Sequence, residues 1–126
     1  MKFISTNPNF PFSRGVIHSG PMLETVLTGI PVGANVPIAG GVAEEMHEIF
    51  RQLDALLHEV CVDKTAIVSV RLYLQNVNRD IAAVNEVYKE YFGKHPPNRR
   101  AYGVDLQVSM LVEAAFVAEL PRERPE

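Results

Sequence analysis

The stretch Ile67-Val68-Ser69-Val70-Arg71-Leu72-Tyr73-Leu74 decides the fold class, because its side chains alternate in character. One face of an extended chain would carry only apolar residues: Val68, Val70, Leu72 and Leu74. The other face would carry Ser69, Arg71 and Tyr73. A period of two is typical of a β-strand with one face in the core. The mixed opposite face indicates a surface that is not simply open to water.

An amphipathic helix is predicted on each side of this strand. From Val42 to Val60, apolar residues recur at three- and four-residue steps and form one stripe. The acidic pair Glu44-Glu45 suits the positive N-terminal end of that helix. After the strand, Asn76-Val77-Asn78 offers an N-cap for a second helix, which repeats the same spacing up to Phe92 and can end at Gly93.

Further strands are predicted toward both ends of the chain. Arg14 to Ser19 and Leu23 to Thr28 are rich in strand-forming residues, and Gly20-Pro21 between them predicts a hairpin turn. Val32 to Gly41 is predicted to be a loop. The last two strands are expected at Ala101 to Leu106 and Met110 to Ala118. The chain before the first strand, from Ile4 to Phe12, is expected to be an irregular arm because of its prolines.

Arg99 and Glu113 are the charged residues whose positions call for an explanation. Arg99 follows the rigid connector Pro97-Asn98 and is either a solvated loop charge or an anion anchor, since a guanidinium can grip a carboxylate through two parallel hydrogen bonds. Glu113 is the one charged residue in the apolar run Met110 to Ala118. It is either an edge-strand residue in water or a buried carboxylate that needs a partner or a proton.

Composition excludes several classes of protein. The chain has 126 residues, 47% of them hydrophobic, which fits one domain over residues 1–126 with a charged tail at 119–126. A net charge of -3 with scattered basic residues disfavours nucleic-acid binding. Cys61 is the only cysteine, so neither an internal disulfide nor a cysteine-rich zinc site can form. Without a spanning apolar run or a signal-peptide pattern, we expect a cytoplasmic protein that does not bind membranes.

The order of these elements predicts an α+β fold in which both helices pack on one face of the sheet. Strands that are apolar on both sides then need a second cover, and no third helix remains to supply it. Further copies of the same chain are the simplest cover, so we expect a homo-oligomer.

Four segments resemble the Rid family, the YjgF-type reactive intermediate deaminases, in order and spacing. They are Gly40-Gly41-Val42-Ala43-Glu44-Glu45, Val84-Asn85-Glu86-Val87-Tyr88-Lys89-Glu90-Tyr91-Phe92, Pro97-x-Arg99 and Val112-Glu113. The resemblance runs from about Ile4 to Ala118. It implies a chorismate-mutase-like (YjgF-like) fold with a mixed sheet, a homotrimer, and ligand clefts between subunits.

The resemblance also implies an activity and a site. Active members hydrolyse 2-imino acids that arise from 2-aminoacrylate-type intermediates, giving 2-keto acids and ammonia. Arg99 would clamp the substrate carboxylate, and Glu113 would activate the water and protonate the leaving ammonia. Phe12, Thr28, Gly29 and Asn85 would line the cleft, although spacing alone places Asn85 on a helix surface. No metal or cofactor is expected, because imine hydrolysis needs neither.

The chain departs from the family pattern at several cleft positions. Phe12 stands where the family commonly has a tyrosine, and Ile30 stands where it has a glutamine. Ala115 replaces the second glutamate of an Ile-Glu-Ile-Glu pattern. A non-catalytic trimer that binds small carboxylates through Arg99 is therefore the alternative function. Ribonuclease activity or inhibition of translation, an older interpretation of the family, gains little support from the acidic composition.

Overall fold

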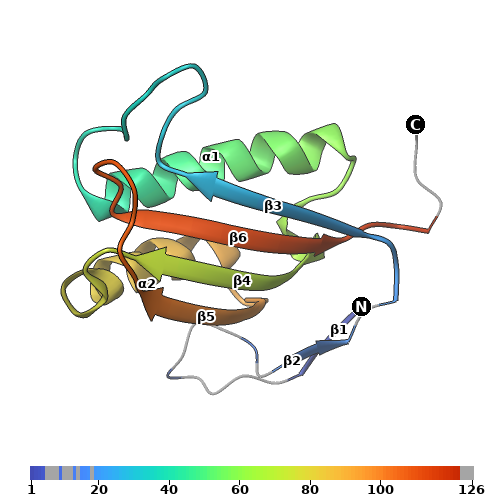
Figure 1. The fold of residues 1–126 in the computed structure, drawn as a ribbon. Helices are drawn as coiled ribbons and strands as arrows, with labels where there is room; N and C mark the ends of the chain where they lie inside the picture. The colour runs from blue at the N-terminus through green and yellow to red at the C-terminus, as the bar shows by residue number, and fades with distance from the viewer. Residues whose placement is uncertain (5–8, 10–12, 14, 18, 123–126) are drawn as a thin grey trace.

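Two helices lie against one face of a four-stranded sheet in the computed structural model, which describes residues 1–4, 9, 13, 15–17 and 19–122 (Figure 1). The helices are α1 (Val42–Glu59) and α2 (Val77–Phe92). The strands, in spatial order, are β3 (Met22–Thr28), β6 (Val112–Glu119), β4 (Ile67–Leu74) and β5 (Asn98–Gly103). Since β6 runs antiparallel to β3 and β4 while β4 and β5 are parallel, the sheet is mixed and the predicted α+β fold is confirmed.

The strand and the helices at the centre of the chain form as predicted. β4 has the predicted bounds, and Val70, Leu72 and Leu74 on its helix-facing side are 0% exposed. A short 3₁₀ turn, η1 (Lys64–Ala66), leads into it from α1. Each fully buried side chain of this size contributes about 1.5–3 kcal/mol relative to exposure. The core that they form is built from α1, α2, β4 and β6. None of the helices in the described part of the chain is long and apolar enough to cross a bilayer.

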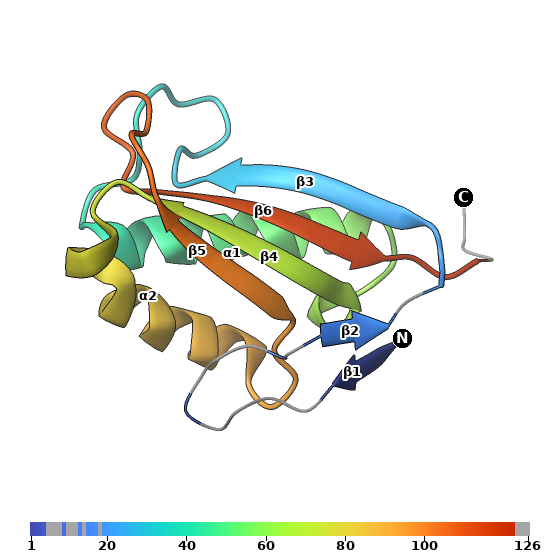
Figure 2. The same cartoon turned by 60° about the horizontal axis from the view of Figure 1, so that its bottom comes forward.

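The predicted hairpin of 14–19 and 23–28 is wrong. A short strand, β2 (Gly15–Ile17), pairs with β1 (Lys2–Ile4) in a separate two-stranded sheet, which lies beside the start of β5 (Figure 2). β3 instead pairs along its whole length with β6. The Gly20-Pro21 pair stays with β6, since Gly20 N donates to Glu119 Oε1 at 3.2 Å and Leu120 N donates to Pro21 O at 2.7 Å. Local turn chemistry was therefore overridden by burial of β3 against the core.

The last two strands are shifted from their predicted bounds. β5 begins at Asn98 because its first residues already pair with β4, Asn98 opposite Ser69 and Arg99 opposite Val70. β6 begins only at Val112, after a turn in which Val108 has a positive φ of 58°. At its other end Leu120 is 5% exposed, so of the predicted charged tail only Pro121 and Arg122 are both described and exposed.

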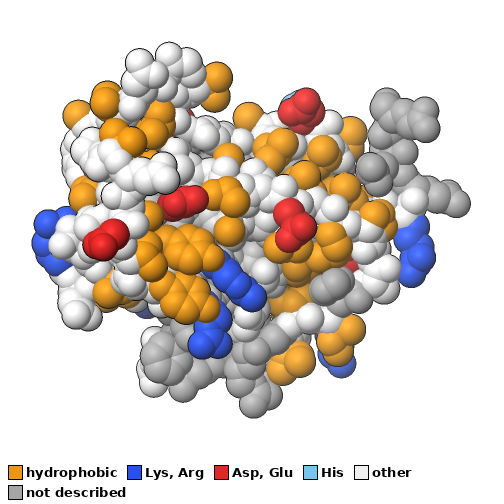
Figure 3. All heavy atoms as spheres, viewed as in Figure 1, with side chains coloured by type: hydrophobic (Ala, Val, Ile, Leu, Met, Phe, Trp, Pro, Cys, Tyr) orange, Lys and Arg blue, Asp and Glu red, His pale blue; other side chains and the backbone are white. Residues whose placement is uncertain are grey.

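The sheet face that points away from the helices, which we call the strand face, has no cover within the described residues. Alternation and register place three rows of side chains on it: Thr28, Glu113, Tyr73 and Tyr102, then Val26, Ala115, Arg71 and Arg100, then Glu24, Val117, Ser69 and Asn98. Figure 3 looks onto this face and shows hydrophobic side chains over the strands with Lys or Arg side chains among them. Val26 is 58% exposed and Tyr102 is 37% exposed. Because β6 is an inner strand, the edge-strand interpretation of Glu113 is wrong.

Candidate functional site

Arg99 is held between β5 and α2, on the helix side of the sheet. Its side chain is buried, with 8% of the residue exposed. Nη1 donates a hydrogen bond of 2.7 Å to Asn85 Oδ1, and the guanidinium carbon lies 4.8 Å from the centroid of the Tyr88 ring. An amide and an aromatic face therefore fix the plane of the guanidinium before any ligand arrives. The solvated loop arginine, one of the two sequence interpretations, is not what the structure shows.

The connector before Arg99 is fixed as well. Ser13 N donates to Pro97 O at 3.0 Å, the Ser13 hydroxyl donates to Pro96 O, and Asn98 Nδ2 donates to Ser13 O at 3.1 Å. This cluster ties the start of β5 to the N-terminal segment. Phe12, the predicted cleft ring, immediately precedes Ser13 but lies outside the described residues.

Burial changes the acid–base properties of the Arg99–Tyr88 pair. Removal from water lowers the pKa of Arg99, and the neighbouring Tyr88 partly opposes that change. Burial raises the pKa of Tyr88, so its phenol stays neutral at physiological pH. A guanidinium keeps its proton even when buried, so Arg99 presents a permanent positive charge beside a neutral ring.

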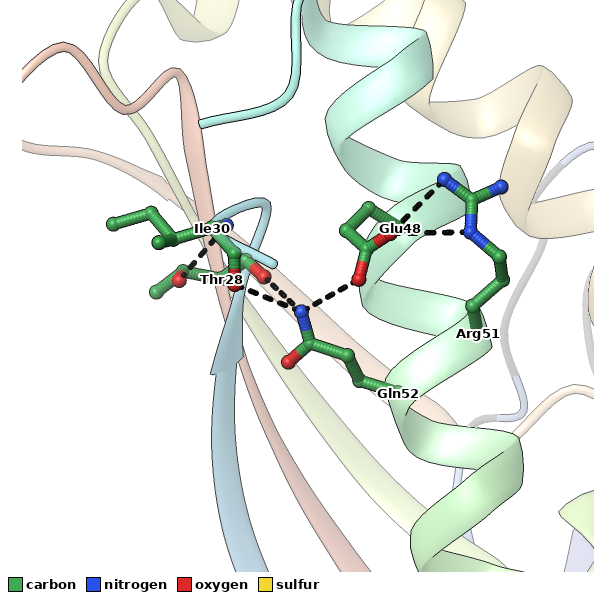
Figure 4. Close-up of polar contacts among 5 residues, drawn as sticks. All are labelled: Thr28, Ile30, Glu48, Arg51 and Gln52. Atoms are coloured by element: carbon green, nitrogen blue, oxygen red, sulfur yellow. Dashed lines mark hydrogen bonds and ion pairs between the residues drawn. The ribbon is translucent and has the colours of Figure 1, made fainter. Parts of the chain in front are cut away.

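Thr28, Gly29 and Glu113 gather at the other end of the sheet. Thr28 is the register partner of Glu113 on β6, and Glu113 is half-buried on the strand face. Gln52 of α1 fastens the turn that follows β3 (Figure 4). Its Nε2 donates to Thr28 O at 3.2 Å, to Ile30 O at 3.0 Å and to Glu48 Oε2 at 2.9 Å. Sequence reasoning missed Gln52, which reads as one more polar residue on the exposed side of α1.

Gly29 is required by packing against α1. A Cβ atom built on Gly29 would lie 2.6 Å from both Cβ and Cγ of Glu45, closer than any real contact allows. Gly29→Ala is therefore expected to lower the free energy of unfolding by about 1–3 kcal/mol. Urea denaturation followed by circular dichroism measures this, with Ala34→Ser, at an exposed position of the following loop, as the control. Unchanged stability of Gly29→Ala would show that the turn moves away from α1 freely.

Glu45 is a second residue that sequence reasoning missed. It was assigned to the helix N-terminus as a favourable charge, but it is 3% exposed. Its Oε1 accepts a hydrogen bond of 2.9 Å from Leu111 N, just before β6 begins. Burial raises the pKa of Glu45, while the backbone N–H groups of Leu111 and Val112 act in the opposite direction. Glu45 thus joins α1, the Gly29 turn and the start of the strand that carries Glu113.

Substitution of Glu45 is expected to change both stability and its pH dependence. Glu45→Ala should cost about 2–3 kcal/mol, because buried side-chain atoms are lost and the partly buried N–H of Leu111 loses its acceptor. Glu45→Gln keeps an acceptor and should cost about 1 kcal/mol or less near neutral pH. Since the pKa of Glu45 is raised above 4.5 on folding, its contribution is complete below that value and is lost as pH rises through the higher folded pKa. The free energy of unfolding, measured from pH 4.5 upward, should fall in wild type relative to Glu45→Gln. If the free energies of the two proteins change with pH in parallel, this prediction is wrong.

The candidate site residues fall into two separate clusters, which we call half-sites. The first half-site is Arg99 with Asn85 and Tyr88, on the helix side of β5. The second half-site is Glu113 with Thr28 and Gly29, at the start of β6. Arg99 lies level with Val70 and Phe116, whereas Glu113 is three residues further along β6 and two strands away. Strand geometry puts the two Cα atoms on the order of 14 Å apart, with side chains on opposite faces. One chain therefore does not bring Arg99 and Glu113 together.

The described residues also form a groove outside these half-sites, and they contain no group of side chains suited to a metal ion. A groove of about 540 Å³ runs between β3 and α1, with Leu27 and Val32 on one side and Gln52 and Leu56 on the other. No predicted site residue lines it. Among the described residues, no three His, Cys, Asp or Glu side chains are grouped so that they could hold a metal ion.

A family model and individual sequence relatives agree on the proteins that this chain resembles. The family model described as Endoribonuclease L-PSP matches residues 5–120. The chain is 31% identical over 94 residues to 2-iminobutanoate/2-iminopropanoate deaminase of Homo sapiens, covering 75% of this chain and 68% of that protein. It is 32% identical over 110 residues to a RutC family protein of Pyrococcus abyssi, covering 79% of this chain and 86% of that protein.

Solved structures share the fold. A Rid family protein of unknown function from Yersinia pestis superposes with a TM-score of 0.79 at 21% identity, covering 92% of this chain and 93% of that one. A putative endoribonuclease from Thermotoga maritima superposes with a TM-score of 0.73 at 23% identity, covering 96% and 98%. At these identities the structures establish the arrangement of helices and strands.

Proposed function

Because the chain belongs to the Rid (YjgF) family, we propose that it is a cofactor-free deaminase that hydrolyses 2-imino acids, such as 2-iminobutanoate and 2-iminopropanoate, to 2-keto acids and ammonia. The observation that carries the proposal is the fixed guanidinium of Arg99, held by Asn85 and the Tyr88 ring. A relative that is 31% identical carries the name of this activity.

Arg99 serves as the carboxylate clamp. Its guanidinium can form two parallel hydrogen bonds to the carboxylate next to the imine carbon, and this fixes the electrophilic carbon in one position. The neutral Tyr88 ring and the Asn85 amide hold the guanidinium plane, so little ordering is left to occur on binding. Thr28 and Gly29 shape the wall beside Glu113.

Glu113 serves as the general base and acid. Its carboxylate accepts a proton from water as the water oxygen bonds to C2 of the imine, giving a carbinolamine. The carboxyl group then returns that proton to the nitrogen. Glu113 next takes the remaining hydroxyl proton of the carbinolamine and passes it to the same nitrogen, so the C–N bond breaks, ammonia leaves as NH3, and the electron pair freed on the oxygen forms the C=O bond of the keto acid. The reaction consumes one water and involves no change of oxidation state.

We assign the complete site to a contact between copies of the chain in a homotrimer. The two half-sites lie on opposite faces of one sheet, so a second copy is needed to bring a Glu113 to an Arg99. The strand face carries exposed apolar residues that a neighbouring copy would cover. A cyclic trimer with this head-to-tail arrangement would contain three equivalent sites.

We place the protein in the cytoplasm, a reducing compartment, because Cys61 is an exposed thiol and the sequence has no other cysteine. We also propose that residues 1–126 form one domain.

The test is an imine hydrolysis assay. A PLP-dependent dehydratase generates 2-aminoacrylate in situ, and keto-acid release is followed with and without the protein. Release should be faster than in buffer, and both Arg99→Ala and Glu113→Ala should remove the acceleration. If wild type gives no acceleration, the deaminase proposal fails.

The second candidate is a trimer that binds small carboxylates without turning them over. The finding that favours it is that the carboxylate-binding half-site is assembled within one chain, whereas Glu113 is not part of it. Calorimetric binding of 2-oxobutanoate that depends on Arg99, together with no acceleration of imine hydrolysis, would establish this candidate over the first.

A further inference from the structure

Arg71 and Arg100 are direct neighbours on the strand face. They are register partners on the parallel strands β4 and β5, and both are exposed. Like charges placed opposite one another destabilise a sheet unless something neutralises them. The ion pairs found among the described residues are Arg51–Glu48 and Arg79–Asp80, so neither strand-face arginine is neutralised by an ion pair there. The pair therefore forms a small, concentrated positive patch.

The surroundings of this patch give it shape. Tyr73 and Tyr102 stand one row further along, with ring centroids 5.7 Å apart and planes inclined by 19°. The Arg100 guanidinium carbon lies 5.9 Å from the Tyr102 ring centroid, which restrains its position. Within the same row, Arg71 is the register partner of Ala115, a small side chain on β6. The two guanidinium groups therefore lie next to the Tyr73–Tyr102 pair, and the small Ala115 side chain lies beside Arg71.

Glu113 belongs to the same surface. It pairs in register with Tyr73, while Arg71 pairs with Ala115, so Glu113 and Arg71 are diagonal neighbours. Diagonal positions on adjacent strands are about 7–8 Å apart, a gap that an arginine side chain can span. A molecule whose reacting carbon lies at Glu113 can therefore extend toward Arg71 and Arg100. Arg99, in contrast, points to the opposite face of its own chain.

We propose that the Arg71–Arg100 pair is a subsite for the distal carboxylate of 2-imino dicarboxylates, which makes these the preferred substrates. The inference rests on the proposed imine hydrolysis. Arg99 of a neighbouring copy holds the carboxylate beside C2, Glu113 acts at C2, and the two strand-face arginines hold the carboxylate at the far end. Two guanidinium groups suit one carboxylate through charge-assisted hydrogen bonds.

Paired substrates test the subsite. An amino-acid oxidase generates the imines of glutamate and of 2-aminobutanoate in situ, and semicarbazide traps whatever imine is not hydrolysed. The kcat/KM ratio of dicarboxylate to monocarboxylate imine should be about tenfold or more in wild type, the size of one charge-assisted contact. Arg71→Gln and Arg100→Gln should each lower that ratio about tenfold, whereas Lys89→Gln, an exposed charge on α2, should keep it.

A binding measurement separates failure of the subsite from failure of the proposed function. Calorimetry compares 2-oxoglutarate with 2-oxobutanoate, both stable keto acids. If no imine is hydrolysed faster than in buffer, the proposed function fails and this comparison alone decides the subsite. Tighter binding of the dicarboxylate that disappears in Arg71→Gln and Arg100→Gln supports it. Equal affinities for the two keto acids overturn the subsite. It is also overturned if Arg71→Gln and Arg100→Gln change the oligomeric state but keep wild-type selectivity, because the arginines would then pack against another copy.

Discussion

Arg99→Ala is expected to lower kcat/KM for 2-iminobutanoate hydrolysis by about a hundredfold or more. Truncating one partner of a desolvated, charge-assisted contact costs about 2–5 kcal/mol, and each 1.4 kcal/mol is a factor of ten. Arg99→Lys should recover only part of the loss, because an ammonium cannot form the two parallel hydrogen bonds of a guanidinium. Steady-state kinetics with imine generated in situ measures both variants.

Two controls make this result specific to the clamp. Arg99 is buried, so the denaturation midpoint of Arg99→Ala has to be measured beside its kinetics. Arg51→Ala removes an arginine from the exposed surface of α1 and should leave kcat/KM within about twofold. Loss of activity in Arg100→Ala together with full activity in Arg99→Ala would contradict the assignment of the clamp.

Mixing two inactive variants is expected to restore activity if the site is shared between copies. In a cyclic trimer each site takes Arg99 from one chain and Glu113 from the next. Any trimer that contains both Arg99→Ala and Glu113→Ala chains then has one site with both residues intact. Random reassembly of equal amounts should therefore give about a quarter of wild-type activity, by counting the intact sites. The measurement requires denaturing and refolding the two variants together.

Separate refolding of each variant, followed by mixing without exchange, is the control and should give no recovery. A chain carrying both substitutions, co-refolded with wild type, provides a reference for the dilution of intact subunits. No recovery in properly co-assembled trimers would mean that Arg99 and Glu113 act within one chain. The opposite-face placement of the two side chains would then have to change on ligand binding.

The elements with a strong hydrophobic period were predictable, whereas the pairing of strands was not. β4 and α1 each carry an apolar pattern that only one secondary structure can bury, so their bounds follow closely from the sequence. The hairpin expected at Gly20-Pro21 failed because the core favours pairing β3 with β6, a partner that lies about 90 residues away. A turn signal such as Gly20-Pro21 reflects only local backbone preferences, so it does not indicate which distant strand will pair with β3.

The sequence proposed residues for the candidate site, but it did not predict the packing contacts that hold them. Arg99 and Glu113 stood out by their positions in the sequence, the family resemblance supplied their proposed roles, and strand alternation already separated Arg99 from Arg100. Asn85 was placed on a helix surface by spacing alone, but it holds Arg99. Glu45 could have been noticed, because it lies three residues after Val42 and four before Ile49, inside the buried stripe of α1. Its acceptance of the Leu111 N–H depends on tertiary structure that no local pattern encodes.

The strand order β3-β6-β4-β5 has a consequence for how the chain reaches its folded state. The strand that is last in sequence lies between two strands that are made much earlier, so β3 and β4 keep open edges until β6 is synthesised and inserted. Contacts of such high sequence separation slow folding and leave unpaired strands exposed to aggregation. A ribosome that stalls before Val112 would thus release a chain with both helices but with a split sheet, an aggregation-prone substrate for chaperones.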